Sequence, residues 1–455
     1  MNMNQQIMSA GGGSASGGKK IFQNILRYFA QKILQKYKPE IIGITGSVGK
    51  TSAKEAIFTV LDFQFNVRQN IKSYNNEIGV PLTIIGAETA GRNIFKWLLI
   101  FLKIFRLLII KDETYPKILV LEMGADKVGD IEYLVKLAPP KIGVLTAVAE
   151  THLHAFTDLK GVLKEKEKIV TTLAKEGVAL LNADDENVMS IKNKIKAQIY
   201  TFGFSDNADI KANEILFTGF EQDFCQTEYA WDCKTWGMNF KVSYQGSTIP
   251  VFLTGCFGKQ FVYTALAAIG VGLIYKINLV DIADALKNYN PPKGRMNLIN
   301  GIKHTLIIDD TYNSSPQAAK AALEVIKMID LPEGKSKIVV LGDMLELGER
   351  SAGAHREVGF KVAEYELDYL ITIGKESEFI SEAAKEAGLA VEKVNHFADR
   401  EKAGLYLQNL IQEGDLILIK GSQGMRMEKI VEEIMAEPEK AGELLVRQAG
   451  EWKNK

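Results

Sequence analysis

The sequence predicts an α/β protein with a central P-loop ATPase-type doubly wound sheet and a Rossmann-like C-terminal α/β domain. Short apolar runs that resemble buried strands alternate with longer amphipathic segments along most of the chain. The first run, 41–44, leads into a glycine loop and a helix, the order of a phosphate-binding loop. The alternation stops at the proline- and glycine-containing stretch 290–294 and then resumes. We therefore expect a central domain at 41–292 and a second doubly wound domain at 293–455.

The composition is that of an ordinary globular protein, with 46% hydrophobic and 24% charged residues. A net charge of −1 gives no general attraction to nucleic acid, which we exclude as a partner. Cys225, Cys233 and Cys256 lack the spacing of a metal site, so we expect reduced thiols in a cytoplasmic protein. Residues 1–20 are rich in Gly and Ser, lack the apolar core of a secretory signal and predict a flexible tail.

Two amphipathic segments flank the glycine loop. The first, within 21–40, places its apolar residues at helical spacing and predicts a helix docked on the central domain. The second, 92–111, is apolar and interrupted only by basic residues, which fall on one stripe of a helix. Charges inside the run disfavour a spanning helix. Two interpretations remain: peripheral contact with anionic lipid at the inner membrane face, or packing on another domain or subunit.

The glycine loop has the spacing G-x-x-G-K-T, from Gly46 to Thr51. Gly46, Ser47 and Gly49 would let the backbone approach an anion, and the N-terminus of the helix predicted from 52 would present free N–H groups. Lys50 would reach the β- and γ-phosphates of a nucleotide, and the hydroxyl of Thr51 would bind Mg²⁺. The loop therefore predicts ATP binding.

A carboxylate follows the next central strand of the predicted sheet. Strand 118–121 ends at Glu122, where open α/β sheets place their ligands, and a carboxylate there is suited to hold Mg²⁺ against ATP. His152 follows strand 142–146 at the same edge, although a lone histidine is more often structural. The remaining elements of this domain are predicted as helices 52–62, 127–137, 158–175 and 258–275, strand 178–181, and shorter β-like segments within 198–254.

The second domain shows the same alternation beyond the boundary at 290–294. Apolar runs predict four strands, and amphipathic segments between them predict four helices. The strands are expected at 304–309, 337–341, 369–373 and 415–419, and the helices at 315–329, 353–365, 377–387 and 425–435.

Nine motifs follow one another between residues 41 and 435: GITGSVGKTSAKE, YNNEIGVP, LEMGADKVGDIEYL, THLHAF, GVLKEKEKI, PPKGRMN, DDTYNSSP, GDMLELGE and KGSQGMRMEKIV. This ordered set resembles the Mur ligase family, and DDTYNSSP and GDMLELGE resemble its MurF branch. The resemblance implies an ATP-dependent amide ligase that adds D-alanyl-D-alanine to UDP-N-acetylmuramoyl-tripeptide through an acyl phosphate, in peptidoglycan precursor synthesis. It also implies two Mg²⁺ ions.

The resemblance assigns roles in the central domain. Lys50, His152 and Lys166 would be catalytic, and Thr51 would bind the phosphates and Mg²⁺. Glu122 and His152 would hold the second Mg²⁺, with Asn75 and Asn76 near the phosphates. Lys166 aligns with the lysine that these enzymes carbamylate, which would make it a metal-supporting carboxylate. The residues alone favour a solvated helix face there, because lysines at 164, 166 and 168 alternate with glutamates.

The resemblance also assigns roles in the second domain. Arg295 and Asp310 would help close this domain on the nucleotide, and Tyr312 and Asn313 would surround the adenine and ribose. The incoming dipeptide would be lined by segment 343–348, which includes Asp343 and Glu346, and by Lys420, Gly421 and Ser422.

Three features depart from the family pattern. Only residues 1–40 precede the first strand, where the family carries a domain that grips UDP, so we expect that domain to be lacking. The segment 92–111 is an insertion, and GKQFVYTALAA at 258–268 alters the expected adenine contacts. Two alternatives stay open: a sister ligase with a different carboxylate acceptor, and a non-catalytic ATP-binding scaffold at the membrane. We expect a monomer.

Overall fold

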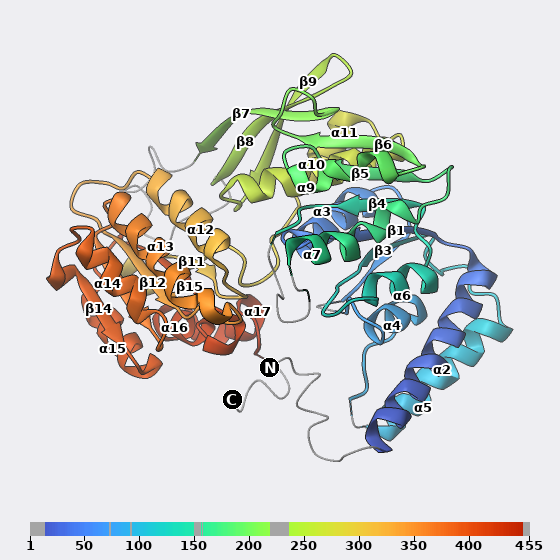
Figure 1. Cartoon of the computed structure of the whole chain (residues 1–455), viewed down its shortest axis with the longest axis horizontal. Coiled ribbons are helices and arrows are strands. Elements are labelled where there is room, and N and C mark those ends of the chain that lie inside the picture. Colours follow the sequence, from blue (N-terminus) through green and yellow to red (C-terminus); the bar gives the residue numbers. More distant parts are fainter. Residues whose placement is uncertain are drawn as a thin grey trace. The chain divides into compact units, whose positions relative to one another are not determined.

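The computed structural model describes residues 14–71, 74–91, 93–149, 156, 158–218 and 236–448. These residues divide into two compact units (Figure 1). The first unit takes residues up to 214 together with 240–251 and 260–289, and the second takes 215–239, 252–259 and 290–455. Each unit contains a mostly parallel sheet with helices, which confirms the predicted fold class.

Parallel strands make up most of the first sheet. Their neighbours are fixed by register pairs such as Ile44↔Glu122 and Thr45↔Leu145. Three of these strands, at 40–45, 118–122 and 142–145, are almost wholly buried, as expected for near-continuous apolar runs. In sheet order the strands are β2 Val67–Gln69, β3 Ile118–Glu122, β1 Glu40–Thr45, β4 Ile142–Leu145, β5 Val178–Asn182 and β6 Gln198–Gly203. The order continues through β7 Ile210–Thr218, β8 Gly237–Tyr244 and β9 Ser247–Thr254.

The first sheet is covered by helices. Those at 50–62, 130–137 and 259–274 lie close to predicted positions, whereas those at 79–85, 186–190 and 279–286 were not predicted. The helices are α3 Lys50–Asp62, α4 Gly79–Ile85, α6 Asp130–Leu137, α7 Leu159–Lys166, α8 Lys168–Thr171, α9 Glu186–Ser190, α10 Lys259–Ile274 and α11 Leu279–Leu286. The single helix expected at 158–175 was wrong, because it is divided into α7 and α8 and ends at Thr171. The chain turns soon afterwards, where the Gly177 N–H donates to the Ala174 carbonyl before β5.

The two amphipathic segments are both helices and lie side by side (Figure 1). They are α2 Ser14–Tyr37 and α5 Ile94–Ile109. The ring of Phe22 on α2 meets Trp97 on α5 edge to face, with centroids 4.7 Å apart. Asn93 caps α5, since its side chain accepts from the Lys96 N–H. In the part of the chain that the structure describes, no helix is long and apolar enough to cross a membrane.

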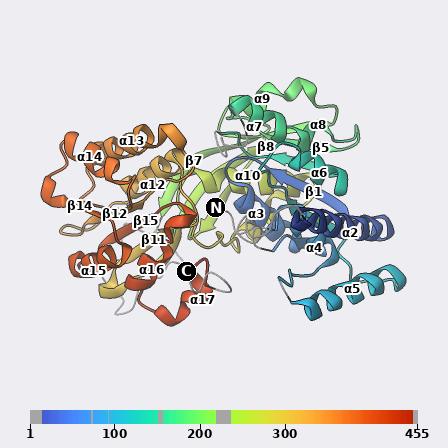
Figure 2. The same ribbon diagram turned by 60° about the horizontal axis from the view of Figure 1, so that its bottom comes forward.

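The second unit contains a six-stranded sheet with one antiparallel edge. Its order is β10 Asn297–Asn300, β11 Leu306–Asp310, β15 Leu416–Lys420, β12 Lys337–Gly342, β13 Tyr369–Ile373 and β14 Val394–Phe397. Helices α12 Pro316–Met328, α13 Ser351–Glu364 and α14 Glu378–Glu386 lie on one face, and α15 Arg400–Leu410 and α16 Glu428–Ile434 on the other (Figure 2). Short α17 Ala441–Leu444 follows.

Sequence reasoning missed β10, β14 and α15 in this unit. Both strands are edge strands of four residues, and β14 (VNHF) alternates too little to be recognised by periodicity. An edge position, where a strand is paired on one side, readily accommodates such half-polar segments.

Candidate active site

The glycine loop lies at the carboxyl end of β1, between β3 and β4. Gly46 has a φ of 156°, and a Cβ there would lie 2.1 Å from Thr146 Oγ1. Gly49 has a φ of 82° and is the N-cap residue of α3. Only glycine fits these two positions without strain, so the loop passes close to β4 and exposes backbone N–H groups at the helix N-terminus. This is the geometry of an anion site.

The residues that follow β4 hold the loop in place. The Ser47 N–H donates to the Ala147 carbonyl at 2.6 Å, and Ser47 Oγ donates to the Ala149 carbonyl at 2.9 Å. In return, Thr146 Oγ1 donates to the Val48 carbonyl at 2.6 Å. Sequence reasoning missed Thr146, whose signal is its position directly after a buried strand. These bonds preorganise the loop before a ligand arrives.

Two lysine ammonium groups converge on one carbonyl oxygen of the loop. Lys50, the first residue of α3, donates to the Gly46 carbonyl at 2.7 Å and to the Ser47 carbonyl at 3.3 Å. Lys166, at the end of α7, donates to the same Gly46 oxygen at 2.9 Å. Two lysine side chains beside a cradle of backbone N–H groups favour the binding of an anion here.

Lys166 is 2% exposed, which overturns the solvated-face interpretation of its helix for this residue. Burial, followed by the charge of Lys50, lowers the pKa of the Lys166 ammonium to about 7. Its neighbour Glu165 is also buried and accepts from the N–H groups of Gly129 and Ile131 near the start of α6. The side chains of α7 therefore fix both the lysine and the adjacent loop.

One carboxylate oxygen of Glu122 accepts a hydrogen bond, and the other has no partner among the described residues. Its Oε1 accepts from Asn75 Nδ2 at 2.8 Å, and its backbone N–H donates to Asn70 Oδ1 at 2.6 Å. Its Oε2 is buried and has no hydrogen-bond partner among the described residues. A buried carboxylate oxygen without a donor is costly unless a cation binds it, so the residue fits a Mg²⁺ ligand. Asn70, which sequence reasoning missed, follows β2 and orients this glutamate.

The other predicted residues of this unit take different positions. Thr51 lies half-buried in the first turn of α3. Asn76 accepts from the N–H groups of Ile78 and Gly79 in the turn before α4, whereas Asn75 donates to Glu122. His152 lies outside the described residues. No group of three or more His, Cys, Asp or Glu side chains that could hold a metal occurs in the described part of the chain. Mg²⁺ at a nucleotide commonly takes only one or two protein carboxylates, with phosphates and water supplying the rest.

In the second unit, the loops at the carboxyl ends of β11, β12 and β15 meet. Lys420 is 2% exposed and its Nζ contacts Asp310 Oδ2 at 2.6 Å and the Asn313 carbonyl at 2.9 Å. These residues are aligned because Asp310 and Lys420 are register partners on neighbouring strands. The Arg295 guanidinium stacks on the Tyr312 ring at 4.2 Å. The structure thus brings Lys420 together with the four residues expected around the nucleotide. These are Arg295, Asp310, Tyr312 and Asn313.

The residues predicted on the dipeptide side are largely engaged in local structure. Asp343 accepts from the N–H of Ser377 at 2.8 Å, and its carbonyl accepts from the Ser422 N–H at 3.0 Å. Ser422 Oγ accepts from the Leu345 N–H at 2.8 Å. A Cβ on Gly421 would lie 2.6 Å from Met427 Cγ, so this position is closely packed. Glu346 is exposed, with a φ of 67°.

Asp309, beside Asp310, gives a testable pH dependence. Burial raises the pKa of its carboxyl to about 7, and Oδ1 accepts from Thr311 N and Oγ1. A raised folded pKa means that the stabilisation is complete below pH ~4 and is lost as the pH rises to ~7. Asp309→Asn, which keeps the Oδ1 acceptor, is expected to raise the free energy of unfolding at pH 8 by about 1–3 kcal/mol. At pH 4 we expect little difference.

The measurement is chemical unfolding of the full chain, followed across this pH range. Asp330→Asn, at an exposed aspartate of the same unit, is the matched control and should track the unchanged chain. Parallel pH profiles for Asp309→Asn and the unchanged chain would contradict the prediction.

Comparison with protein families gives two matches that cover much of the chain. The Mur ligase middle domain matches residues 104–272, and the Mur ligase, glutamate ligase domain matches residues 294–423. The UDP-N-acetylmuramoyl-tripeptide--D-alanyl-D-alanine ligase of Bacillus subtilis (strain 168) is 30% identical over 413 residues. That match covers 91% of this chain and 79% of the relative. The chain belongs to the Mur ligase family.

Further Mur ligases extend the comparison. The Escherichia coli (strain K12) protein with the same description is 29% identical over 401 residues, covering 88% of this chain and 77% of its own. Among solved structures, MurF from Acinetobacter baumannii has a TM-score of 0.72 at 26% identity, covering 90% of this chain and 79% of that one. MurF ligase from Thermotoga maritima in complex with ADP has a TM-score of 0.72 at 26% identity, covering 92% and 84%. The predicted family and fold are confirmed.

Proposed function

We propose that this Mur ligase joins D-alanyl-D-alanine to the terminal carboxylate of UDP-N-acetylmuramoyl-tripeptide, with ATP as the energy source, in peptidoglycan precursor synthesis. The relatives that match most of the chain carry this activity in their descriptions. The observation that carries the proposal is the convergence of Lys50 and Lys166 on the Gly46 carbonyl. A nucleotide phosphate in the cradle would meet the Lys50 ammonium, and Lys166 would lie beside the same loop carbonyl.

The reaction balances in two steps. The substrate carboxylate attacks the γ-phosphorus of ATP; a new P–O bond forms, the bond to the bridging oxygen breaks, and ADP leaves. The neutral amine of D-alanyl-D-alanine then attacks the acyl carbon, phosphate leaves with its electron pair, and the amine proton passes to phosphate or solvent. Both partners in the first step are anions, so charge neutralisation and positioning supply most of the rate.

The residues of the first unit provide that neutralisation. In this proposal, Lys50 turns from the loop carbonyls to the β- and γ-phosphates, and the backbone N–H groups after Gly49 bind the phosphate oxygens. Thr51 and Glu122 would hold Mg²⁺, with Asn75 fixing the glutamate. A bound Mg²⁺ offsets charge on the transferred phosphoryl group. His152 retains its predicted metal role as part of the proposal.

We also propose that Lys166 is carbamylated. The reaction needs a neutral amine, and burial next to Lys50 already lowers the pKa of this ammonium to about 7. The ammonium first loses one proton. Attack of the neutral amine on CO₂ then forms an N–C bond and releases a second proton, so that a buried cation becomes an anion. That anion would relieve the repulsion with Lys50 and could support a second Mg²⁺.

In the second unit, we propose that Arg295, Asp310, Tyr312 and Asn313 contribute to nucleotide binding. The side chains at 343–346 and 420–422 would line the dipeptide. The support is their clustering at the carboxyl ends of β11, β12 and β15, where α/β sheets bind ligands. We further propose that the enzyme acts as a cytoplasmic monomer with peripheral membrane contact through 92–111.

The test is an assay of the purified chain with UDP-N-acetylmuramoyl-tripeptide, D-alanyl-D-alanine, ATP, Mg²⁺ and bicarbonate. We expect one amide product and one equivalent each of ADP and phosphate. Omitting the dipeptide serves as the control and should abolish the product. Product from a different carboxylate acceptor, with none from the UDP compound, would overturn the assigned substrate while keeping the ligase chemistry.

A further inference from the structure

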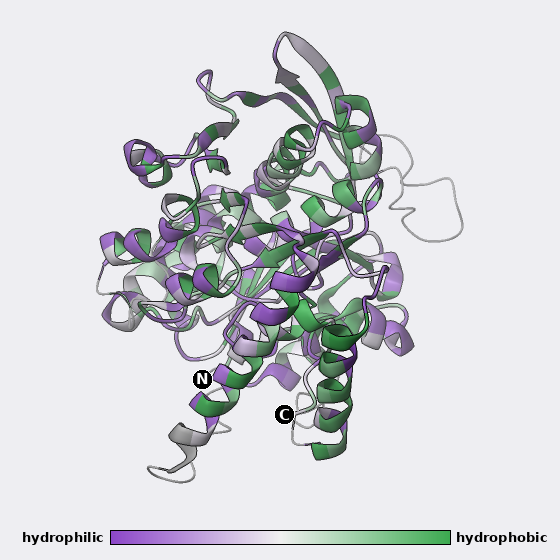
Figure 3. Cartoon of the chain, turned by 90° about the vertical axis from the view of Figure 1, so that its right-hand side faces the viewer, coloured by the Kyte–Doolittle hydropathy of each residue, from purple (hydrophilic) through white to green (hydrophobic). Residues whose placement is uncertain are grey.

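Helix α5 exposes an apolar face along its whole length. Its inward side buries Ile100, Ile104 and Leu107. Its outward side carries seven large apolar side chains whose exposures lie between 49% and 81%. At 100° per residue they fall within an arc of about 140°. They are Ile94, Phe95, Leu98, Leu99, Leu102, Phe105 and Ile109. Figure 3 shows α5 as a predominantly hydrophobic helix.

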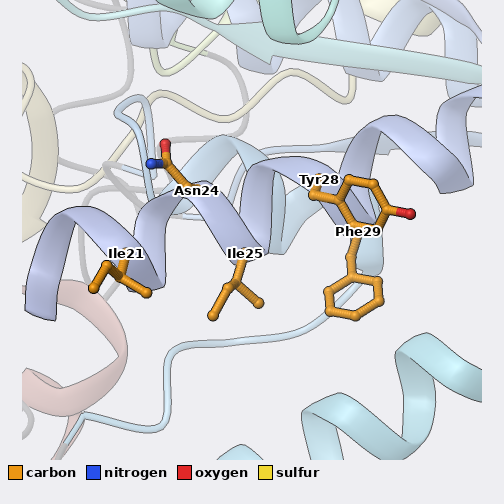
Figure 4. A pocket seen from close by; sticks show the side chains of 5 residues that line it. All are labelled: Ile21, Asn24, Ile25, Tyr28 and Phe29. Atoms are coloured by element: carbon orange, nitrogen blue, oxygen red, sulfur yellow. The ribbon is translucent and has the colours of Figure 1, made fainter.

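Helix α2 extends this face. Ile21, Ile25 and Tyr28 are exposed at helical spacing, and they line a shallow cavity of ≈ 520 Å³ together with Asn24 and Phe29 (Figure 4). The ring centroids of Phe29 on α2 and Phe105 on α5 are 5.8 Å apart. We call the seven residues of α5 together with Ile21, Ile25 and Tyr28 of α2 the apolar platform. A patch of this kind usually marks an interaction site.

The platform is held in a fixed position. Lys36 Nζ on α2 donates to the carbonyls of Leu107, Leu108 and Ile110 at 2.8–3.0 Å. These carbonyls lie at the C-terminal end of α5, where a cation also interacts favourably with the negative end of the helix dipole. Tyr37 OH donates to the Leu107 carbonyl at 3.0 Å, and Lys103 Nζ donates to the Gly86 carbonyl. The apolar face is therefore presented outward by specific bonds.

One edge of the platform is basic. Lys96, Lys103 and Arg106 are exposed and lie within about 80° of one another on α5. Between Ile94 and Ile109 there is no acidic residue. An apolar face bordered by lysine and arginine is typical of helices that lie in the interface of an anionic membrane. A helix of 16 residues lying flat would contact lipid over about 24 Å.

We propose that the apolar platform docks this ligase on an anionic lipid bilayer, with α5 lying in the plane of the interface. Its apolar side chains would enter the headgroup boundary, and its basic edge would contact anionic headgroups. The positive charge of the basic edge favours anionic lipid over a second copy of the chain, because the basic edges of two copies would repel each other. The proposal rests on the peripheral membrane contact proposed above, for which it names the docking surface and the lipid class, and it is independent of the ligase substrate.

The experiment is co-sedimentation of the full chain with vesicles of phosphatidylcholine, with and without phosphatidylglycerol. We expect binding to the mixed vesicles that weakens as salt increases. Phe95→Ser/Leu99→Ser should weaken this binding by about tenfold or more, because two highly exposed apolar side chains are lost. Lys96→Gln/Arg106→Gln should weaken binding to the mixed vesicles, and reduce its salt dependence.

The matched control is Val391→Ser/Leu405→Ser, which removes two exposed apolar side chains of the second unit. It should bind vesicles as the unchanged chain does. All variants should keep their ligase activity without vesicles, which shows that they fold. Two results would overturn the proposal: equal sedimentation with and without anionic vesicles, or a dimer in light scattering that Phe95→Ser/Leu99→Ser dissociates. The second result would assign the platform to self-association.

Discussion

Lys50→Met is expected to lower kcat for amide formation by about three orders of magnitude. Methionine keeps most of the length of the side chain but removes the ammonium group, which lies 2.7 Å from the Gly46 carbonyl of the glycine loop. The transferred phosphoryl group would then lose its closest cation from α3. The measurement is the steady-state rate of ADP and amide formation at saturating ATP and Mg²⁺.

Lys385→Met, at an exposed lysine of the second unit, is the control and should leave kcat unchanged. Thermal unfolding of both variants should match the unchanged chain, since Lys50 is only half-buried. A Lys50→Met enzyme with nearly normal kcat would show that the loop binds phosphate through its backbone alone.

Lys166→Met is expected to lower kcat by about two to three orders of magnitude, because the proposed carbamate supplies a negative charge that methionine cannot. Added short carboxylates should restore part of the rate by entering the space left beside the Gly46 carbonyl. In the unchanged chain, activation by bicarbonate should increase as the pH rises through about 7, where the buried amine becomes neutral. The measurement is the initial rate after preincubation with bicarbonate across this pH range.

Lys50→Met is the matched control for the rescue. It lacks a positive charge beside the same carbonyl and not the proposed carbamate, so added carboxylates should not restore its activity. Bicarbonate-independent activity of the unchanged chain, together with no rescue of Lys166→Met, would contradict carbamylation. A structural role alone would give a Lys166→Met enzyme with a lower unfolding temperature and no carboxylate response.

The central elements of both sheets could be predicted because their signal is local. Residues 118–121 and 338–341 are buried on both faces and are all apolar, so these strands are visible without tertiary information. Edge strand β14 and helix α15 were missed for the opposite reason. Polar or partly exposed residues interrupt the apolar pattern of both elements, so pairing with β13 and packing against α16 identify them.

The candidate site divides in the same way. The loop from Gly46 to Thr51 was recognisable because its chemistry depends on residue types at fixed spacing. Asn70 and Thr146 were missed, because their roles arise from long-range hydrogen bonds to Glu122 and to the loop. The solvated interpretation of Lys166 failed for a similar reason. A Lys/Glu alternation on a helix does not indicate which side faces a sheet.

The sequence by itself determined the fold class, the family resemblance and the phosphate loop, since each is written in residues that are neighbours along the chain. Only the tertiary structure decided that Lys166 meets Lys50 at one carbonyl oxygen, and that Glu122 keeps one buried oxygen without a described partner. It also decided which face of α5 is covered by α2 and which is left exposed. The reason is physical: burial and charge proximity depend on distances in space, and these follow from how the strands and helices pack.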